Sequence, residues 1–438
     1  MAGWDTLKGL LDEELKQRNE EGCDTEGFEK IIATAANDKE REVVYRKLMR
    51  LKRKKKNFQY REPSELKKIL RKRPKFPIDK IEFSISEDQL YDKVYGAWLG
   101  RCAGCALGKP IEGWGKESIE KYLKNAGAYP LDYYVPSVSK NEKGDQIKAS
   151  CPQSTRENIK FMEVDDDINY TVAGLVIAEQ SGLNFTTQDI GNFWLSSLPY
   201  KDVCTAERQA YLNLANVLPI EEVPVFHNPY REWIGAQIRA DFWGYMSPGK
   251  PKQAAELAFR DAALSHVKNG IYGEMFVAAM IAAAFAENDI KKIIQVAASQ
   301  IPKTSRLYEA IQDCLEWSKL LNWQQAFETM MSKYGRYHQV HTINNACIVL
   351  IGLLFSENDL EKAITIAVMC GLDTDCNGAT AGSIMGAILG AKALPEKWIK
   401  PLNDTLSSTI VSSSDSFFRV KISELAQRTV GIIKRSNK

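Results

Sequence analysis

Two carboxylates, Asp373 and Asp375, stand two residues apart in segment 371–377 (GLDTDCN), directly before a predicted helix that runs from Gly378 to about Ala393. In an extended segment, alternate side chains point the same way, so both carboxylates can reach one point. An Asp at this position also caps a helix well, which explains the pair without any ligand. Mg²⁺ and Ca²⁺ need several oxygen ligands. The pair therefore becomes a candidate cation site only if other carboxylates join it.

A second acidic cluster, Asp165, Asp166 and Asp167, begins another predicted helix that extends to about Gln180. Three adjacent aspartates repel one another, and are tolerated when they are solvated, placed at a helix N-terminus or neutralised by a cation. The helix behind them is rich in apolar residues and is predicted to be buried, which argues against a freely solvated cluster. We therefore expect both acidic helix starts to face one site.

Two predicted helices carry glycine at every fourth position. The glycines are Gly96, Gly100, Gly104 and Gly108 in the first helix, and Gly378, Gly382, Gly386 and Gly390 in the second. Each glycine costs about 1 kcal/mol of helix propensity relative to alanine, and close helix packing is the simplest compensation. We expect the two helices to lie at the centre of the fold, in contact with each other. That contact would bring Glu112, just after the first helix, close to Asp373 and Asp375.

The composition is that of a large globular protein. The chain has 438 residues, 44% of them hydrophobic, and a formal net charge of +2, which allows a large core and gives no general attraction to nucleic acid. The nine cysteines show no disulfide framework, and the C-x-x-C pair Cys102 and Cys105 has no second pair to complete a zinc site. Reduced cysteines, a start (MAGWD) unlike a signal peptide and apolar runs too short to span a membrane predict a cytoplasmic protein with no membrane partner.

Residues 1–85 differ from the rest and are predicted to form a charged, helical, basic N-terminal extension and linker, followed by one domain over residues 86–438. Segment 39–75 is strongly basic, with runs at 52–56 and 71–73. Such a run is either a solvated helix face or a contact with an acidic or protein partner. It lacks the interleaved aromatic residues and motifs typical of nucleic-acid binding.

The remaining sequence has helical periodicity and no convincing period-two strand pattern, so the fold class is predicted to be all-α, a compact multi-helix bundle around a central metal cleft. Segment 235–245 is polar and aromatic and suits either a flat ligand or ordinary core. His266 ends a predicted helix from Ala254. A single histidine in such a place is more often structural than catalytic.

The order of these motifs resembles the ADP-ribosylglycohydrolase family, of the type that includes dinitrogenase-reductase-activating glycohydrolase. The resemblance covers the chain from about Leu90 onward. Four matches carry it: the glycine helix followed by Pro110 and Glu112, the acidic start at 165–167, Gly235 and Arg239 followed by Ser265-His266, and the G-x-D-T-D-x-N segment at 371–377.

The resemblance implies a hydrolase with two Mg²⁺ ions, or Mn²⁺, that cleaves the bond between ADP-ribose and a protein side chain or small molecule. It implies metal ligands at Asp165, Asp166, Asp167, Asp373, Asp375 and Cys376, with the register of the 165–167 pair ambiguous by one residue. It implies catalytic roles for Glu112 and Asp166. It implies substrate-binding roles for Gly108, Arg239, His266, Gly270, Tyr272 and Asn377.

The expected chemistry is consistent with these residue types. Such a glycosidic bond breaks through an oxocarbenium-like state. A carboxylate can remove a proton from the attacking water, a cation can polarise that water, and helix N-termini can hold a pyrophosphate.

The chain departs from the family pattern in its acidic motifs. Cys105 replaces an aspartate, Cys376 replaces a hydroxyl residue, and Asp165 and Ile168 replace threonines. A thiol is a poor magnesium ligand, so one metal position is expected to be altered. Two alternatives stay open. One is a non-catalytic ADP-ribose-binding protein, and the other is a magnesium phosphohydrolase of the haloacid-dehalogenase type, which would need a parallel sheet.

Overall fold

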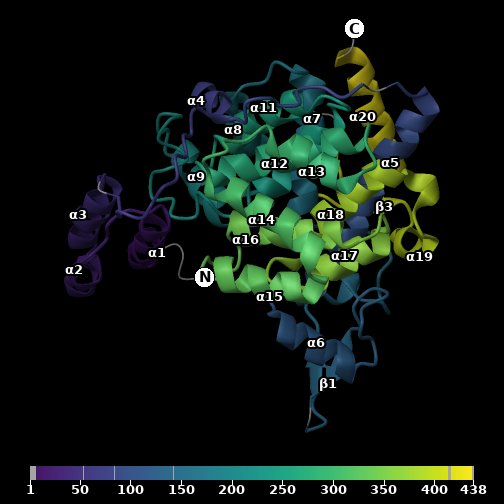
Figure 1. The fold of residues 1–438 in the computed structure, drawn as a ribbon, viewed down its shortest axis with the longest axis horizontal. Coiled ribbons are helices and arrows are strands. Elements are labelled where there is room, and N and C mark those ends of the chain that lie inside the picture. The colour runs from purple at the N-terminus through teal and green to yellow at the C-terminus, as the bar shows by residue number, and fades with distance from the viewer. Residues whose placement is uncertain (1–5, 53, 83, 142, 413–415, 437–438) are drawn as a thin grey trace.

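The computed structural model describes residues 6–52, 54–82, 84–141, 143–412 and 416–436. These residues form helices α1 to α20, several short 3₁₀ helices and two small antiparallel two-stranded sheets. The predicted all-α class is confirmed (Figure 1). In the part of the chain that the structure describes, none of the helices combines the length and apolar character needed to span a membrane.

Helices α5 (Glu87–Gly108) and α18 (Thr374–Leu389) pack against each other at the centre, as predicted from their glycines. A Cβ atom on Gly100 would collide with the carbonyl oxygen of Gly382, and one on Gly104 with that of Gly378. The helices run antiparallel, because Gly96 meets Gly386 near one end and Gly108 meets Thr374 near the other. The bare stripes therefore allow backbone contact along the whole pair.

The predicted extent of the second glycine helix was wrong at its C-terminal end. Helix α18 stops at Leu389, and Gly390 adopts a positive φ of 78°. A glycine with positive φ ends a helix at little steric cost. Gly390 therefore terminates α18, although it still lies against α5 at Asp92 and Gly96, as expected of the fourth glycine of the stripe.

Helices from several parts of the chain surround the central pair. They are α7 (Asp166–Ser181), α10 (Asp241–Tyr245), α11 (Pro251–Ala262), α12 (Asn269–Ala284), α13 (Ile290–Ala298), α16 (Thr342–Leu354), α17 (Leu360–Met369) and α20 (Ile422–Ser436). Helix α12, which is alanine-rich and buried along its whole length, contacts α10, α11, α13, α16 and α18, and α17 packs on α18.

The outer elements complete the bundle. The helices are α8 (Thr187–Ser197), α9 (Thr205–Ala215), α14 (Arg306–Leu320), α15 (Trp323–Tyr334) and α19 (Glu396–Ile399), and the 3₁₀ helices are Lys109–Ile111, Pro152–Ser154, Tyr200–Asp202, Gln237–Arg239, Ala391–Ala393 and Lys400–Leu402. Helix α6 (Lys116–Asn125) projects from the body together with strands β1 (Val138–Lys140) and β2 (Gln146–Lys148), at the bottom of Figure 1. Strands β3 (Thr405–Leu406) and β4 (Val420–Lys421) form the second antiparallel pair.

The N-terminal residues form α1 (Leu7–Glu20), α2 (Phe28–Thr34), α3 (Asp38–Met49) and α4 (Leu66–Lys72), with α1 to α3 at one edge of the molecule (Figure 1). Leu10, Leu11 and Tyr45 form a small separate core with Tyr230 and Trp233 of the main body. The N-terminal helices are therefore held by apolar packing as well as by polar contacts.

Part of the basic run is used inside the chain. Lys54 Nζ donates to the carbonyl oxygen of Glu21 at 2.7 Å, and Lys55 Nζ donates to Asn19. Arg53 lies outside the described residues. The predicted acidic or protein partner for the rest of the run stays a prediction.

Candidate metal centre

The end of α5 places Glu112 beside the acidic start of α18. The chain after α5 pairs with the chain before α18, since Gly113 N donates to Leu372 O at 2.9 Å and Leu372 N to Trp114 O at 3.0 Å. Carboxylate oxygens of Glu112, Asp373 and Asp375 consequently lie within 4.8 Å of one another. The expected approach of Glu112 to the D-x-D pair is confirmed.

The acidic start of α7 divides into two parts. Asp165 caps the helix by accepting the backbone N–H of Asp167 at 3.0 Å, and Asp165 and Asp166 line a cavity. Asp167 is buried and lies 3.1 Å from Arg101 Nη2 through its Oδ1 atom. Arg101 in turn lies 2.8 Å from Asp241. The three adjacent aspartates thus point into different surroundings, and Asp165 and Asp166 are the pair that faces the cavity.

Lys109 supplies a positive charge that the sequence reading missed. Its Nζ atom lies 2.5 Å from Asp165 Oδ2 and donates to Val164 O at 2.8 Å. Burial disfavours the ammonium form, but Asp165, Cys105 and Asp375 together outweigh it and raise the pKa of Lys109 above its usual range. The position of Lys109, directly after the last glycine of the α5 stripe, was the available signal.

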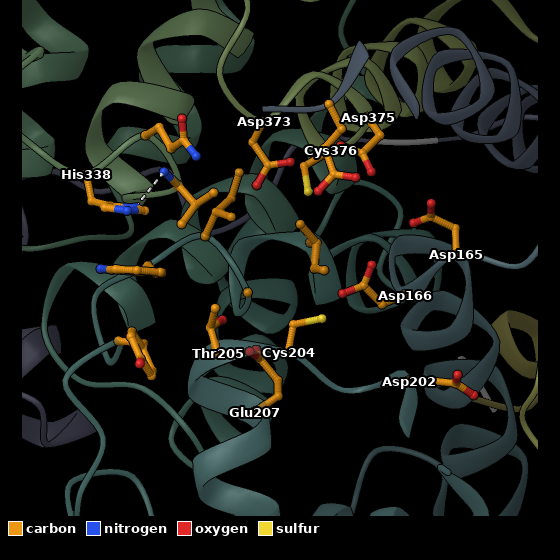
Figure 2. Close-up of a pocket in the computed structure, with 18 of the residues that line it drawn as sticks. Asp165, Asp166, Asp202, Cys204, Thr205, Glu207, His338, Asp373, Asp375 and Cys376 are labelled. Atoms are coloured by element: carbon orange, nitrogen blue, oxygen red, sulfur yellow. Dashed lines mark hydrogen bonds between the residues drawn. The ribbon is translucent and has the colours of Figure 1, made fainter. Parts of the chain in front are cut away.

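A cavity of about 700 Å³ lies over these carboxylates. Figure 2 shows Asp373, Asp375 and Cys376 together on one side, with Asp165 and Asp166 opposite them and Glu207 farther along. The lining residues are Gly9, Glu13, Lys109, Glu112, Val164, Asp165, Asp166, Asn169, Asp202, Cys204, Thr205, Glu207, Tyr230, Trp233, Ile234, Gly235, Ile238, His338, Gln339, Val340, Asp373, Asp375 and Cys376. Gly9 and Glu13 belong to α1, so the N-terminal region forms part of the wall.

Burial and the crowding of like charges raise the pKa values of the cluster. The charge of Asp375, together with burial, raises the pKa of Glu112 to about 8, and burial beside Asp165 raises the pKa of Asp375 to about 6. Burial also raises the pKa values of Asp373 and Asp166. The charge of Asp375 adds to the rise at Asp373, and the charge of Asp165 adds to the rise at Asp166. The ionised cluster is thus short of positive charge.

The donor set fits a divalent cation. Asp373 Oδ1 and Asp375 Oδ1 are buried and have no hydrogen-bond partner, although burying such an atom is costly. Among the described residues that line the cavity, Lys109 is the only lysine or arginine. Clustered carboxylate oxygens with one lysine nearby are the chemistry that hard or borderline divalent cations satisfy.

A comparison with protein-family models decides the family. The model described as ADP-ribosylglycohydrolase matches residues 86–436. The chain belongs to the ADP-ribosylglycohydrolase family. The match agrees with the predicted resemblance at the level of the family, and it leaves the residues before 86 outside.

The other comparisons add little to this assignment. A solved structure titled "ADP-ribosylglycohydrolase-related protein complex" is similar, with 16% sequence identity and a TM-score of 0.45, over 80% of this chain and 99% of that chain. The search of curated proteins gives no match.

The six residues predicted to bind substrate in this ADP-ribosylglycohydrolase do not line the cavity. Gly108 packs on Thr374, and Asn377 donates to Asn345 Oδ1 at 2.8 Å. Gly270 packs on Arg231 O, and Tyr272 donates its hydroxyl to Pro63 O. Their roles toward substrate stay predictions.

His266 and Arg239 also lie behind the wall. His266 is buried, and its Nδ1 atom lies 2.8 Å from Ser265 Oγ. Arg239 is buried between Glu207, Asp261 and Glu274, with its guanidinium over the rings of Tyr170 and Trp194. Neither side chain has a surface toward the cavity in this arrangement.

Glu207 is a cavity residue that the sequence reading missed. It comes from the first turn of α9, is paired with Arg239, and has its pKa raised to about 6 by burial. Its only sequence signal was a glutamate near a helix start, which is common in helices without any site.

Proposed function

We propose that this ADP-ribosylglycohydrolase hydrolyses the glycosidic bond between ADP-ribose and an acceptor in the cavity above the two acidic helix starts. The observation that carries the proposal is the convergence of Glu112, Asp373 and Asp375 with Asp165 and Asp166 at one cavity, with unpartnered buried oxygens on both residues of the D-x-D pair. Family membership supports a glycohydrolase.

The carboxylates would hold Mg²⁺ or Mn²⁺, one or two ions. Asp373, Asp375, Asp165 and Asp166 are the cavity-facing ligand candidates, with Cys376 beside them and Asp167 behind. When bound, the ion would polarise a water molecule and orient the ribose hydroxyls.

Glu112 and Asp166 are proposed as the groups that accept a proton from that water. Both line the cavity, and both have raised pKa values, Glu112 through the charge of Asp375 and Asp166 through burial. A carboxylate with a raised pKa is a stronger base once it is ionised, which suits proton removal near neutral pH.

The N-terminus of α9 is proposed to face the pyrophosphate. Cys204 and Thr205 at its start line the cavity, and Cys204 makes no side-chain cap to the first amide groups of the helix. Uncapped N–H groups at the positive end of a helix attract phosphate oxygens. Tyr230 and Trp233 farther along the cavity offer aromatic surface for the base.

The acceptor and the cellular location are further parts of this proposal. The acceptor is a protein side chain, as the resemblance to dinitrogenase-reductase-activating glycohydrolases implies, or a small molecule. The location is the cytoplasm, in agreement with nine free cysteines.

Calorimetric titration of ADP-ribose, followed by turnover assays, tests the proposal. We expect ADP-ribose to bind with Mg²⁺ or Mn²⁺ and much more weakly with EDTA, and the loaded protein to release ADP-ribose from an ADP-ribosylated protein or a small ADP-ribosyl compound. Tight binding without turnover on either substrate class would favour the non-catalytic binder. Release of inorganic phosphate would favour the phosphohydrolase, although the described residues contain no parallel sheet of the kind that activity needs.

A further inference from the structure

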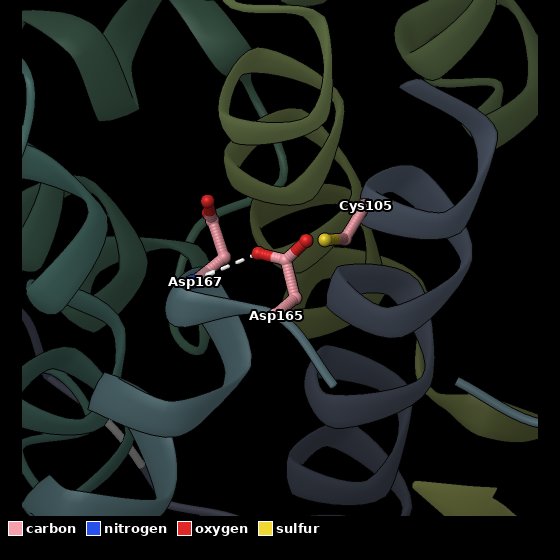
Figure 3. A group of neighbouring side chains, drawn as sticks. All are labelled: Cys105, Asp165 and Asp167. Carbon is pink, nitrogen blue, oxygen red and sulfur yellow. Dashed lines mark hydrogen bonds between the residues drawn. The ribbon is translucent and has the colours of Figure 1, made fainter. Parts of the chain in front are cut away.

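Two cysteine sulfur atoms lie among the carboxylates of the metal centre. Cys376 Sγ donates to Asp167 Oδ2 at 3.1 Å, and it shares a group with one oxygen each of Asp167 and Asp375, all within 4.8 Å of one another. Cys105 Sγ forms a similar group with Asp165 and Asp167 (Figure 3). Both thiols are buried.

The surroundings separate the two sulfur groups. Around Cys105 both carboxylates already have internal cations, because Lys109 is paired with Asp165 and Arg101 with Asp167. Cys105 does not line the cavity. Both carboxylates of the Cys105 group are therefore balanced by the protein itself, and its sulfur atom is away from the cavity.

The Cys376 group is open to the cavity, and of its two carboxylates only Asp167 has an internal cation, Arg101. Cys376 lines the cavity beside Asp373 and Asp375. Asp373 is 5% exposed and Asp375 is 4% exposed, and each has an Oδ1 atom without a hydrogen-bond partner. An ion bound to these oxygens would have Cys376 Sγ within reach of its coordination sphere, since Sγ and an Asp375 oxygen lie within 4.8 Å of each other.

We propose that Cys376 is a metal ligand and makes one metal position of this centre selective for a borderline divalent transition ion, of the class of Co²⁺ and Zn²⁺, over Mg²⁺. The all-carboxylate position of Glu112, Asp373 and Asp375 takes the Mg²⁺ or Mn²⁺ of the proposed function. Mg²⁺ prefers an all-oxygen octahedral shell, whereas thiolate ligands favour softer ions. On binding, the S–H bond of Cys376 breaks, a metal–sulfur bond forms, and one proton passes to solvent, with no change of oxidation state. The inference rests on the proposed function only for the location of the site.

The orientation of Asp167 supports this role for Cys376. Arg101 holds Asp167 through Oδ1 and through its backbone carbonyl at 2.8 Å, which leaves Oδ2 directed at the Cys376 sulfur. A fixed acceptor next to a ligand sets its orientation, as outer partners commonly do at metal sites. The thiol is thereby held next to Asp375.

The first test is a titration of the chelator-treated full chain with Co²⁺, monitored by absorption. We expect a near-ultraviolet sulfur-to-cobalt charge-transfer band in the wild type and in Cys102→Ser, which changes a buried thiol outside both sulfur groups. In Cys376→Ser the band should vanish, the affinities for Co²⁺ and Zn²⁺ should fall at least tenfold, and the affinity for Mg²⁺ should hold or rise. Equal spectra for the wild type and Cys376→Ser would overturn the inference.

A second measurement needs no variant and covers the case in which Cys376→Ser does not fold. X-ray absorption at the zinc edge of the wild-type protein should show a sulfur scatterer at about 2.3 Å. A shell made only of oxygen and nitrogen would exclude Cys376 as a ligand. Turnover with Mg²⁺ and no sulfur signal would refute this inference and leave the proposed function intact, whereas sulfur ligation without turnover would do the reverse.

Discussion

At the residue scale, the metal centre depends on two buried acids, Asp373 and Asp375, each of which has an Oδ1 atom without a hydrogen-bond partner among the described residues. Asp375 belongs to two of the acidic groups, one with Glu112 and Asp373 and another with Asp167 and Cys376. Its Oδ1 atom is buried without a partner. Stability alone gives no reason for this arrangement, and a bound cation does.

Replacing Asp375 by Asn should therefore abolish metal binding without unfolding the protein. The amide keeps the shape and removes one negative charge from a crowded cluster. We expect metal affinity to fall at least about 100-fold, the upper end of the effect of losing an outer-shell partner, and turnover to fall with it, as measured by calorimetry and by ADP-ribose release.

The matched control is Asp202→Asn, since Asp202 lines the same cavity but belongs to none of the three acidic groups. It should bind metal like the wild type. Equal loss in both variants would mean that the net charge of the cavity, and not ligation by Asp375, governs the affinity.

Glu20 at the end of α1 provides a pH-dependent contribution to stability. Burial, and then the charge of Glu232, raises its pKa from 4.5 to about 8. Below pH 4.5 the Glu20 carboxyl is neutral in both the folded and the unfolded chain and does not change the stability. Between pH 4.5 and 8 the unfolded chain loses this proton while the folded chain keeps it, so stability falls as pH rises, and above about pH 8 the loss is complete.

Glu20→Gln should remove this loss of folding stability with rising pH. Relative to the wild type, the variant should gain unfolding free energy between pH 5 and 8, by at most about 5 kcal/mol at 1.4 kcal/mol per pH unit, and hold a constant advantage at higher pH. Urea unfolding at several pH values measures this difference, with Glu29→Gln on α2 as a control for removing a surface carboxylate. A difference that does not vary with pH would contradict the assignment to Glu20.

At the element scale, the α5–α18 contact determines where the acids lie. The two helices touch through backbone atoms from Gly96 to Gly108, so the end of α5 and the start of α18 are fixed next to each other. Thr374 Oγ1 reinforces this contact by donating to Gly108 O at 2.8 Å. Any widening of the pair would displace Glu112 from the D-x-D residues.

Gly100→Ala should show how much the fold depends on this contact. The new methyl group would collide with Gly382 O, so the helices must separate, and we expect a loss of about 3 kcal/mol, typical of an overpacked core. Gly431→Ala in α20 is the matched control, because a Cβ there meets open space and should stabilise the helix by about 1 kcal/mol. Thermal and denaturant unfolding measure both. Equal stability of Gly100→Ala and wild type would show that the helices adapt freely.

The sequence revealed those features whose physical cause is local. A glycine at every fourth position predicted the central pair, and the position of Glu112 followed from that pairing. The direction of Asp167 could not be predicted, because it depends on Arg101, which lies 66 positions away in the chain and within a different helix, α5. Helical spacing shows that three adjacent aspartates point in different directions, but not which of them meets a buried arginine.

At the scale of the whole molecule, the cavity is a joint product of the family domain and the residues before it. Gly9 and Glu13 of α1 line the cavity, and α1 is fixed by contacts to distant positions, with Glu14 and Arg231 separated by 217 residues. No local sequence pattern signals such a pairing. The N-terminal helices, which read as a charged extension, therefore also shape the site.

Arg231→Met should loosen the attachment of α1, which forms this part of the cavity wall. Arg231 is buried and donates to both oxygens of Glu14 at 2.7 and 2.8 Å and to Glu21 at 3.0 Å. Methionine keeps much of the volume but removes the cation that pairs with the buried Glu14, which costs about 3–5 kcal/mol. Glu21 keeps its ion pairs with Arg18 and Lys268. The local stability of residues 7–49 should fall by that amount and their amide exchange should accelerate, while α5 and α18 stay protected.

The matched control is Arg41→Met, which breaks an exposed pair with Asp38 on α3 and should change little. Because α1 carries part of the cavity wall, we also expect weaker ADP-ribose binding in Arg231→Met, with metal affinity preserved, since no metal-ligand candidate lies on α1. Unchanged exchange in residues 7–49 would mean that the apolar cluster around Leu11 and Trp233 holds the wall by itself.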